Sequence, residues 1–195
     1  MTAPDQPAPR HLLLVDDDRL VLTTLNVGLQ RAGYRVSLAE SAEEAEVLLA
    51  GGLRPDLAIV DIRMSGQDGL YLARRLRELD HIPFVMLSAY SEEHMIGQAS
   101  QLGALGYLVK PLDTSQLLPA IEAALARANE LQGLRETRTQ LQAALDAERD
   151  ISVAVGITMT QRHLARQDAF ELLRKLARTQ RRKLAELAAE IIRGE

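Results

Sequence analysis

Short apolar runs alternate with amphipathic stretches over the first 126 residues of the chain. Runs rich in Val, Ile and Leu, without polar alternation, are typical of strands buried on both faces of a parallel sheet. Five such runs occur, at His11–Asp16, Tyr34–Leu38, Asp56–Asp61, Ile82–Leu87 and Gly106–Val109. Between them leucines recur at helical spacing; Asp18 is placed to cap the first helix, and Ser41 with Glu44 forms a capping box for the second. The pattern predicts an α/β domain built on a doubly wound, five-stranded parallel sheet.

Beyond Pro111 the pattern changes to one long helix followed by short ones. Apolar residues recur at steps of three and four, interrupted by Arg138, at Leu118, Ile121, Leu125, Ala128, Leu131, Leu134, Leu141 and Leu145. A helix of this length needs a partner for its apolar side, which predicts a coiled-coil seam between two copies of the chain. An antiparallel hairpin within one chain is the alternative. Two further apolar stripes predict a small all-α domain, with members Phe170, Leu173, Leu176, Ala177, and Leu184, Leu187, Ala188, Ile191.

These changes of pattern divide the chain into four segments. We expect a flexible tail over residues 1–9, which contain three prolines and no apolar run. An α/β domain is expected over 10–126, a coiled-coil linker helix over 127–150 and a small helical domain over 151–195.

Composition narrows the classes of function. The chain has no cysteine, which excludes disulfides, thiolate metal sites and thiol catalysis and fits a cytoplasmic location. No apolar run approaches the roughly 18 residues of a membrane span, so no membrane partner is expected. Net charge is −6 over residues 1–120, −2 over 121–150 and +4 over 151–195. An acidic N-terminal part and a basic C-terminal part suggest two separate functions.

Acidic side chains follow the predicted strands of the α/β domain. Asp16 and Asp17 follow the first strand, Asp61 ends the third, and Ser88 and Lys110 come at the ends of the fourth and fifth. Because functional groups gather at the carboxyl edge of such a sheet, these side chains should lie close together. Three carboxylates without thiols prefer a hard cation such as Mg²⁺. A lysine and a hydroxyl beside them can hold phosphoryl oxygens, so the arrangement favours phosphoryl transfer to an aspartate.

The segments LLLVDDD, IVDIRMSGQDGL, MLSAY and GYLVKP, in this order and spacing, resemble the receiver domain of two-component response regulators over residues 10–126. The resemblance implies a flavodoxin-like fold and a sensor histidine kinase as partner. It implies that Asp61 is the phosphoacceptor, and that Asp16, Asp17, Asp61 and the backbone carbonyl of Arg63 bind Mg²⁺.

The same resemblance assigns the parts of a switch. Ser88 would be the hydroxyl that moves toward the phosphoryl group, and Tyr107 the aromatic side chain that turns inward with it. Lys110 would pair with the phosphate, and the Lys110–Pro111 peptide bond would be cis. Ser65 departs from the pattern, because the family often has proline there.

Basic residues crowd into a short part of the predicted helical domain. They are Arg162, Arg166, Arg174, Lys175, Arg178, Arg181, Arg182 and Lys183. A concentrated basic face suits a phosphate backbone, although a solvated face with partial salt bridges is the simpler alternative. Aromatic residues that could stack on bases are scarce, and Phe170 is expected in the core.

The segments ISVAVGITM, DAFELLRKLA and RKLAELAAEII resemble the ANTAR domain, named for amidase and nitrate transcription antitermination regulators. The resemblance implies three helices, the first continuing the coiled coil, that bind paired RNA hairpins of leader transcripts and prevent a terminator from forming. On this basis, the residues expected to contact RNA are Arg162, Arg166, Arg174, Arg178, Gln180, Arg181, Arg182 and Lys183.

Together these features predict a cytoplasmic, homodimeric response regulator that controls transcription termination through RNA. A DNA-binding or a protein-docking helical output domain is the alternative. We do not expect an enzyme, because residues 127–195 offer no nucleophile–base pair or metal-ligand set. The only chemistry expected is phosphoryl transfer to Asp61 and its slow hydrolysis.

Overall fold

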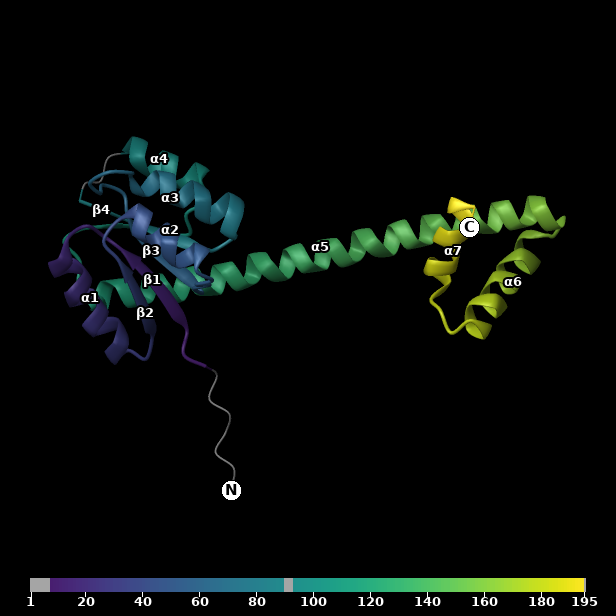
Figure 1. Cartoon of the computed structure of the whole chain (residues 1–195), viewed down its shortest axis with the longest axis horizontal. Helices are drawn as coiled ribbons and strands as arrows, with labels where there is room; N and C mark the ends of the chain where they lie inside the picture. Colours follow the sequence, from purple (N-terminus) through teal and green to yellow (C-terminus); the bar gives the residue numbers. More distant parts are fainter. Residues whose placement is uncertain (1–7, 90–92, 195) are drawn as a thin grey trace, which may run out of the picture. The chain divides into compact units, whose positions relative to one another are not determined.

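The computed structural model describes residues 8–89 and 93–194. Most of the tail expected over residues 1–9 therefore lies outside the described part. The chain divides into two compact units, Met1–Leu131 and Gln132–Glu195, and Figure 1 labels most of their helices and strands.

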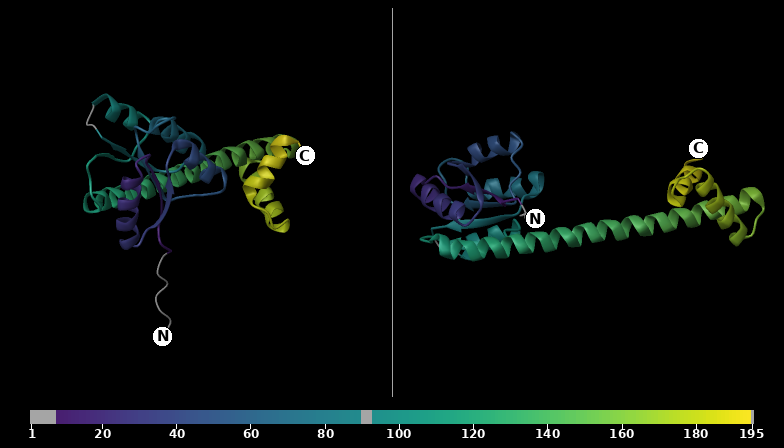
Figure 2. Two further views of the ribbon diagram at one scale, coloured as in Figure 1. Left: turned by 60° about the vertical axis from the view of Figure 1, so that its left-hand side comes forward. Right: turned by 90° about the horizontal axis from the view of Figure 1, so that it is seen from below.

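The N-terminal unit is built on a five-stranded sheet. Its strands are β1 (His11–Val15), β2 (Arg35–Ala39), β3 (Leu57–Asp61), β4 (Phe84–Ser88) and β5 (Tyr107–Val109). All neighbouring strands are parallel, and their order is β2-β1-β3-β4-β5. Figures 1 and 2 show this sheet with helices on both sides of it. The predicted fold is confirmed. Parallel strands direct all their carboxyl ends to one edge of the sheet, which is where the acidic residues were expected.

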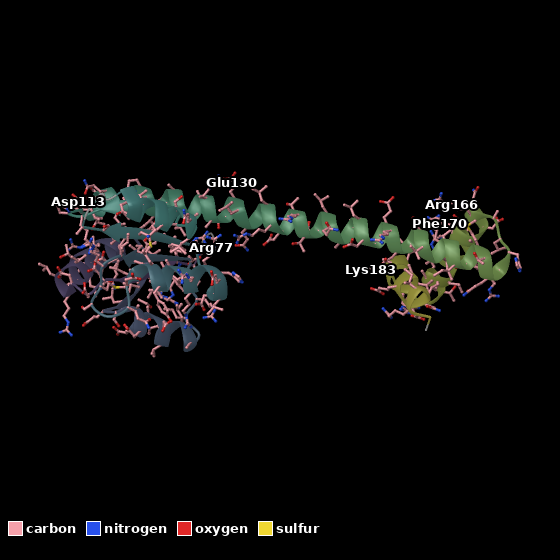
Figure 3. All side chains as sticks on the ribbon, turned by 90° about the horizontal axis from the view of Figure 1, so that it is seen from above. Arg77, Asp113, Glu130, Arg166, Phe170 and Lys183 are labelled. Atoms are coloured by element: carbon pink, nitrogen blue, oxygen red, sulfur yellow. The ribbon has the colours of Figure 1, made fainter. Side chains whose placement is uncertain are left out.

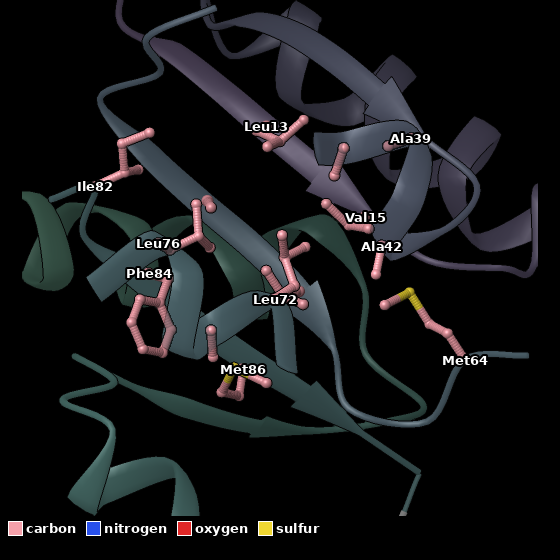
Figure 4. Close-up of a cluster of buried hydrophobic side chains, with 14 of the residues drawn as sticks. Leu13, Val15, Ala39, Ala42, Met64, Leu72, Leu76, Ile82, Phe84 and Met86 are labelled. Atoms are coloured by element: carbon pink, nitrogen blue, oxygen red, sulfur yellow. The ribbon is translucent and has the colours of Figure 1, made fainter. Parts of the chain in front are cut away.

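Helices cover both faces of this sheet. They are α1 (Arg19–Arg31), α2 (Ala42–Ala50), α3 (Gly69–Arg75) with the π-helical turn η1 (Leu76–Asp80), α4 (Glu93–Gln101) and α5 (Thr114–Arg162). Residues of α2, α3 and α4 pack on one face, where Leu72 and Leu76 lie among the strand side chains Leu13 and Phe84 (Figure 4). Residues of α1 and of the first turns of α5 pack on the other face.

Side-chain caps fix where the first helices begin. The Asp18 carboxylate accepts a hydrogen bond of 2.8 Å from the backbone N–H of Leu20, and the Ser41 hydroxyl accepts one of 3.1 Å from that of Glu44. These bonds satisfy N–H groups that have no partner within the helix. The predicted Asp18 cap is confirmed, and Ser41 caps α2 as expected. The predicted capping box is only half formed, because the Glu44 carboxylate accepts from the backbone N–H of Glu40 and not from that of Ser41. The first helix, α1, starts directly behind the acidic residues that follow β1.

The beginning of α5 belongs to the core of the N-terminal unit. Ile121 is fully buried and Leu125 is 6% exposed, both in the cluster that covers β1 and β3. The prediction that these positions form part of a seam between two copies was wrong. A stripe at steps of three and four serves packing on a sheet as well as packing on a second helix, so the spacing alone could not separate the two.

The following part of α5 has no packing partner among the residues that the structure describes. Residues 132–146 are all exposed, including Leu134, Leu141 and Leu145 at about 60% each. The apolar stripe of this part, which continues from Leu131, is therefore available to another molecule.

The C-terminal unit packs the end of α5 against α6 (Arg166–Thr179) and α7 (Leu184–Arg193). Ala169, Leu173 and Ala177 form the buried stripe of α6. Phe170 is 37% exposed, so its predicted place in the core was wrong. The small Ala169 takes the inward position, and Phe170, one residue further around the helix, faces outward.

Candidate functional site

Three charged side chains meet at the carboxyl edge of the sheet. Asp16 follows β1, Asp61 ends β3 and Lys110 follows β5. The Lys110 Nζ atom lies 2.5 Å from Asp16 Oδ2 and 2.7 Å from Asp61 Oδ2. The three side chains are 18%, 0% and 8% exposed, in the order Lys110, Asp16, Asp61. One ammonium group therefore bridges two buried carboxylates. With both carboxylates ionised, the three side chains carry a net charge of −1.

Asp61 is held in an environment that disfavours its charged form. Burial is the main cause that raises the pKa of Asp61, and the nearby charge of Asp16 adds to it, while Lys110 opposes both. In the described part of the chain, the buried Oδ1 atom of Asp61 has no hydrogen-bond partner of ordinary geometry. A buried carboxylate oxygen without a partner is costly. Its position indicates a site where a cation or an incoming group completes the contacts.

Lys110 stays charged in spite of its burial. Burial alone would lower the pKa of Lys110, but hydrogen bonds to Asp16 and Asp61 outweigh it and raise the pKa. A permanently charged ammonium group at this edge can pair with an anionic ligand.

Asp17 completes a set of three carboxylates. Oxygen atoms of Asp16, Asp17 and Asp61 lie within 4.8 Å of one another. All donors are oxygen, which suits Mg²⁺. Asp17 is oriented by Ser65, whose backbone N–H and hydroxyl donate to Asp17 Oδ2 at 2.9 Å and 2.7 Å. The sequence marked Ser65 as a departure from a family pattern but gave no sign that it contacts Asp17.

Replacing Ser65 with Ala removes the contact that lowers the pKa of Asp17 most, the side-chain hydrogen bond. We expect the pKa of Asp17 to rise and Mg²⁺ binding to weaken by roughly tenfold, because a ligand loses the partner that orients it. Carboxyl NMR during a pH titration measures the first effect, and calorimetric titration with Mg²⁺ the second. Ser115→Ala, which alters a hydroxyl bound to Asp113 instead, should change neither. Equal Mg²⁺ affinity in all three proteins would contradict this role.

Gly69 lets α3 begin directly against the end of β3. A Cβ atom at this position would lie 1.9 Å from the backbone oxygen of Asp61. Since that atom is backbone, it cannot move aside cheaply. Gly69→Ala is expected to lower the free energy of unfolding by about 1–3 kcal/mol, measured by urea denaturation. Gly133→Ala, in a helix with open space around it, should not lower the free energy of unfolding. Equal losses of stability in both variants would contradict the crowding at Gly69.

The other predicted site residues of the N-terminal unit lie on β4, on β5 and in the loop after β3. Ser88 ends β4 and is 2% exposed, and its backbone oxygen accepts a hydrogen bond of 2.7 Å from the Lys110 N–H. Tyr107 begins β5 and is partly buried against the core under α3 and α4. Arg63 follows β3 in the loop before α3. The Lys110–Pro111 bond is cis, as the resemblance implied.

The predicted RNA-contacting residues are all exposed on the C-terminal unit. They stand at the end of α5, along α6 and in the turn before α7, at Arg162, Arg166, Arg174, Arg178, Gln180, Arg181, Arg182 and Lys183. Arg182 pairs with Glu190 at 2.5 Å, and Arg174 pairs with Glu171 at 3.4 Å. The other charged members form no ion pair with the described residues. Much of the positive charge therefore stays available to a ligand.

Two family profiles match separate parts of the chain. Residues 12–122 match the response regulator receiver domain, and residues 139–192 match the ANTAR domain. The transcriptional regulatory protein PdtaR of Mycobacterium tuberculosis is 31% identical over 98% of this chain and 97% of its own length. The transcriptional regulatory protein AfsQ1 of Streptomyces coelicolor is 37% identical over 60% of this chain and 51% of its own length.

Solved structures show the same likeness for the N-terminal unit. A putative response regulator from Chloroflexus aurantiacus is 36% identical with a TM-score of 0.56, over 60% of this chain and 98% of that one. The chemotaxis response regulator CheY4 of Vibrio cholerae is 28% identical with a TM-score of 0.55, over 60% and 98%. Among the described residues, no helix has the length and apolar character needed to cross a membrane.

Proposed function

The chain belongs to the response regulators, with an N-terminal receiver domain and a C-terminal ANTAR output domain, and we propose that phosphorylation of Asp61 by a sensor histidine kinase controls its binding to RNA hairpins. Bound to leader transcripts, it would prevent transcription termination. We propose that this activity takes place in the cytoplasm, where the phosphorylated regulator can reach leader transcripts as they are synthesised.

The contact of Lys110 with both Asp16 and Asp61 carries the first half of this proposal. Lys110 holds Asp61 Oδ2, and the Oδ1 atom is left to attack the phosphorus of a phosphohistidine. The new O–P bond forms as the N–P bond breaks, and the histidine nitrogen leaves. Asp16, Asp17, Asp61 and the Arg63 carbonyl would hold Mg²⁺, which supplies positive charge for the phosphoryl oxygens. Lys110 can then turn from the carboxylates to the phosphate.

Ser88 and Tyr107 are our candidates for the residues that couple phosphorylation of Asp61 to the packing of β4, β5 and α4. Ser88 stands at the end of the strand next to Asp61, where its hydroxyl can donate to a phosphoryl oxygen. Tyr107 is only partly buried, so a change of its packing does not require the core to open. A phosphoryl group would thus favour one of two packings of β4, β5 and α4.

The exposed arginines of the C-terminal unit support the second half. A basic surface binds phosphates through counterion release, so affinity should fall steeply with salt. RNA loops also offer unstacked bases that side chains can read. The exposed leucine stripe continuing from Leu131 supports a homodimer, in which two linked ANTAR domains engage two hairpins and gain from effective concentration.

The test is binding to a two-hairpin leader RNA, with duplex DNA as control, at low and high salt and with or without beryllofluoride. The beryllium adduct stands in for the phosphoryl group on Asp61. We expect salt-sensitive binding to RNA in preference to DNA, tightened by the adduct. Binding to RNA that ignores the adduct would remove the switch. Preference for duplex DNA would favour a DNA-binding output, and binding to neither would favour protein docking.

A further inference from the structure

A groove of about 400 Å³ lies within the C-terminal unit, between the last part of α5 and the first turns of α6. Its apolar lining comes from Ile151, Val155 and Phe170, and its polar groups come from Glu148, Ser152, Arg166 and Gln167. A volume of this size with a few polar groups around an apolar wall is typical of a site for a small ligand or part of a larger one.

Phe170 is the unusual member of this groove. It is 37% exposed, whereas Phe84, the other phenylalanine of the chain, is 2% exposed in the core of the receiver domain. The core of the C-terminal unit is closed by Ala169, Leu173 and Ala177 without it. An aromatic ring that the core does not need, beside an apolar wall, presents a flat face for stacking.

Two cations flank this ring. Arg166 lies one turn before Phe170 on α6 and Arg174 one turn after it, and both are exposed (Figure 3 shows Arg166 next to Phe170). In the described part of the chain, Arg166 has no ion pair, and the pairing of Arg174 with Glu171 is long and solvent-exposed. A stacking face between two arginines matches the alternation of base and phosphate along a single strand of nucleic acid.

The opposite wall of the groove carries a carboxylate. Glu148 can only accept hydrogen bonds when ionised, so it suits a base edge that carries an amino group. Adenine, cytosine and guanine have such a group and uracil does not. A second copy of this domain is a poor occupant, because residues 151–195 carry a net charge of +4 and would repel one another.

We propose that this groove binds one unstacked, amino-bearing base of an RNA loop, stacked on Phe170 with its amino group toward Glu148, while Arg166 and Arg174 contact the adjoining phosphates. The inference rests on the RNA binding proposed above and adds a base-specific contact to it. It also identifies one aromatic side chain that can stack on a base, in a chain with few aromatic residues.

The test uses the full-length chain and a pool of RNA hairpins that share one stem and carry a randomised loop. A hairpin selected with the unaltered protein is then made with each loop base in turn removed to leave an abasic site. Affinities are measured for the unaltered protein, Phe170→Ala, Phe170→Leu and Phe170→Tyr. Leu176→Ala serves as control, because Leu176 is a similarly exposed apolar residue of α6 outside the groove.

We expect Phe170→Ala and Phe170→Leu to weaken binding by roughly tenfold or more, and Phe170→Tyr and Leu176→Ala to leave it unchanged. One abasic position, not a uracil, should weaken binding of the unaltered protein by a similar factor and have no further effect on Phe170→Leu. That lack of additivity is the signature of direct stacking.

Three results would overturn the inference. The first is that Phe170→Leu binds the hairpin as tightly as the unaltered protein does. The second is that every abasic position weakens the binding of Phe170→Leu as much as it weakens that of the unaltered protein. The third is that the unaltered protein sediments as a dimer and Phe170→Leu as a monomer. The groove would then be occupied by a second copy of the chain. If the unaltered protein selects no hairpin, the proposed RNA function itself fails. The abasic series on the unaltered protein does not depend on the folding of any variant.

Discussion

Replacing Asp61 with Asn is expected to abolish phosphorylation and, with it, the effect of phosphodonors on RNA binding. The amide oxygen is uncharged and a far weaker nucleophile than a carboxylate oxygen, so the amide does not form the acyl phosphate that a carboxylate forms. Incorporation of phosphate from a small phosphodonor with Mg²⁺, measured by intact mass, should fall to background. Hairpin affinity should no longer respond to the phosphodonor or to beryllofluoride.

Asp18→Asn is the matched control for this experiment. Asp18 is an exposed acid two residues from Asp16 that caps α1, and asparagine caps helices as well as aspartate does. This variant should be phosphorylated like the unaltered protein. Phosphate incorporation that survives in Asp61→Asn and is lost in Asp18→Asn would show that the phosphoacceptor had been assigned wrongly.

Replacing Lys110 with Ala is expected to lower the free energy of unfolding by roughly 3 kcal/mol at about pH 7 without Mg²⁺. The change leaves Asp16 and Asp61, both buried, facing each other without the cation that bridges them. In the variant the pKa of Asp61, already raised by burial, should rise further. Because the folded state then takes up a proton more readily than the unfolded state, the loss of stability should shrink as the pH falls.

Urea denaturation at about pH 7 and about pH 5 checks this expectation, with and without Mg²⁺. Mg²⁺ should restore more stability to Lys110→Ala than to the unaltered protein, since a cation replaces a cation. Lys175→Ala, at an exposed position of α6, should change stability by little at either pH. A loss in Lys110→Ala that is the same at both pH values would mean that packing, not charge, is the cause.

The acidic site could be predicted from the sequence because one rule places it. Parallel strands bring their carboxyl ends to one edge, so Asp16, Asp61 and Lys110 had to meet once the apolar runs were recognised as strands. The contact between Ser65 and Asp17 could not be predicted in this way. Both of its donors belong to a loop, and neither spacing nor hydrophobic pattern fixes how a loop folds over its neighbours.

The predictions that were wrong concern apolar residues on helices, because such residues can pack against more than one kind of partner. Ile121 and Leu125 have the spacing of a coiled coil but pack on the sheet of their own domain. Phe170 lies next to a helical stripe and is apolar, yet the smaller Ala169 occupies the core. Periodicity identifies a helix and its apolar side, while the size of the space between helices decides which residue of that side is buried.

The exposed stretch of α5 over residues 132–146 has a consequence for the protein as a single chain in water. A helix without tertiary packing depends on its own hydrogen bonds, and isolated stretches of this length are marginally stable. Its amide protons should therefore exchange with solvent within seconds to minutes while the strands of the sheet remain protected. A second helix along Leu134, Leu141 and Leu145 would slow that exchange, so deuterium uptake in this one segment reports assembly without any RNA being present.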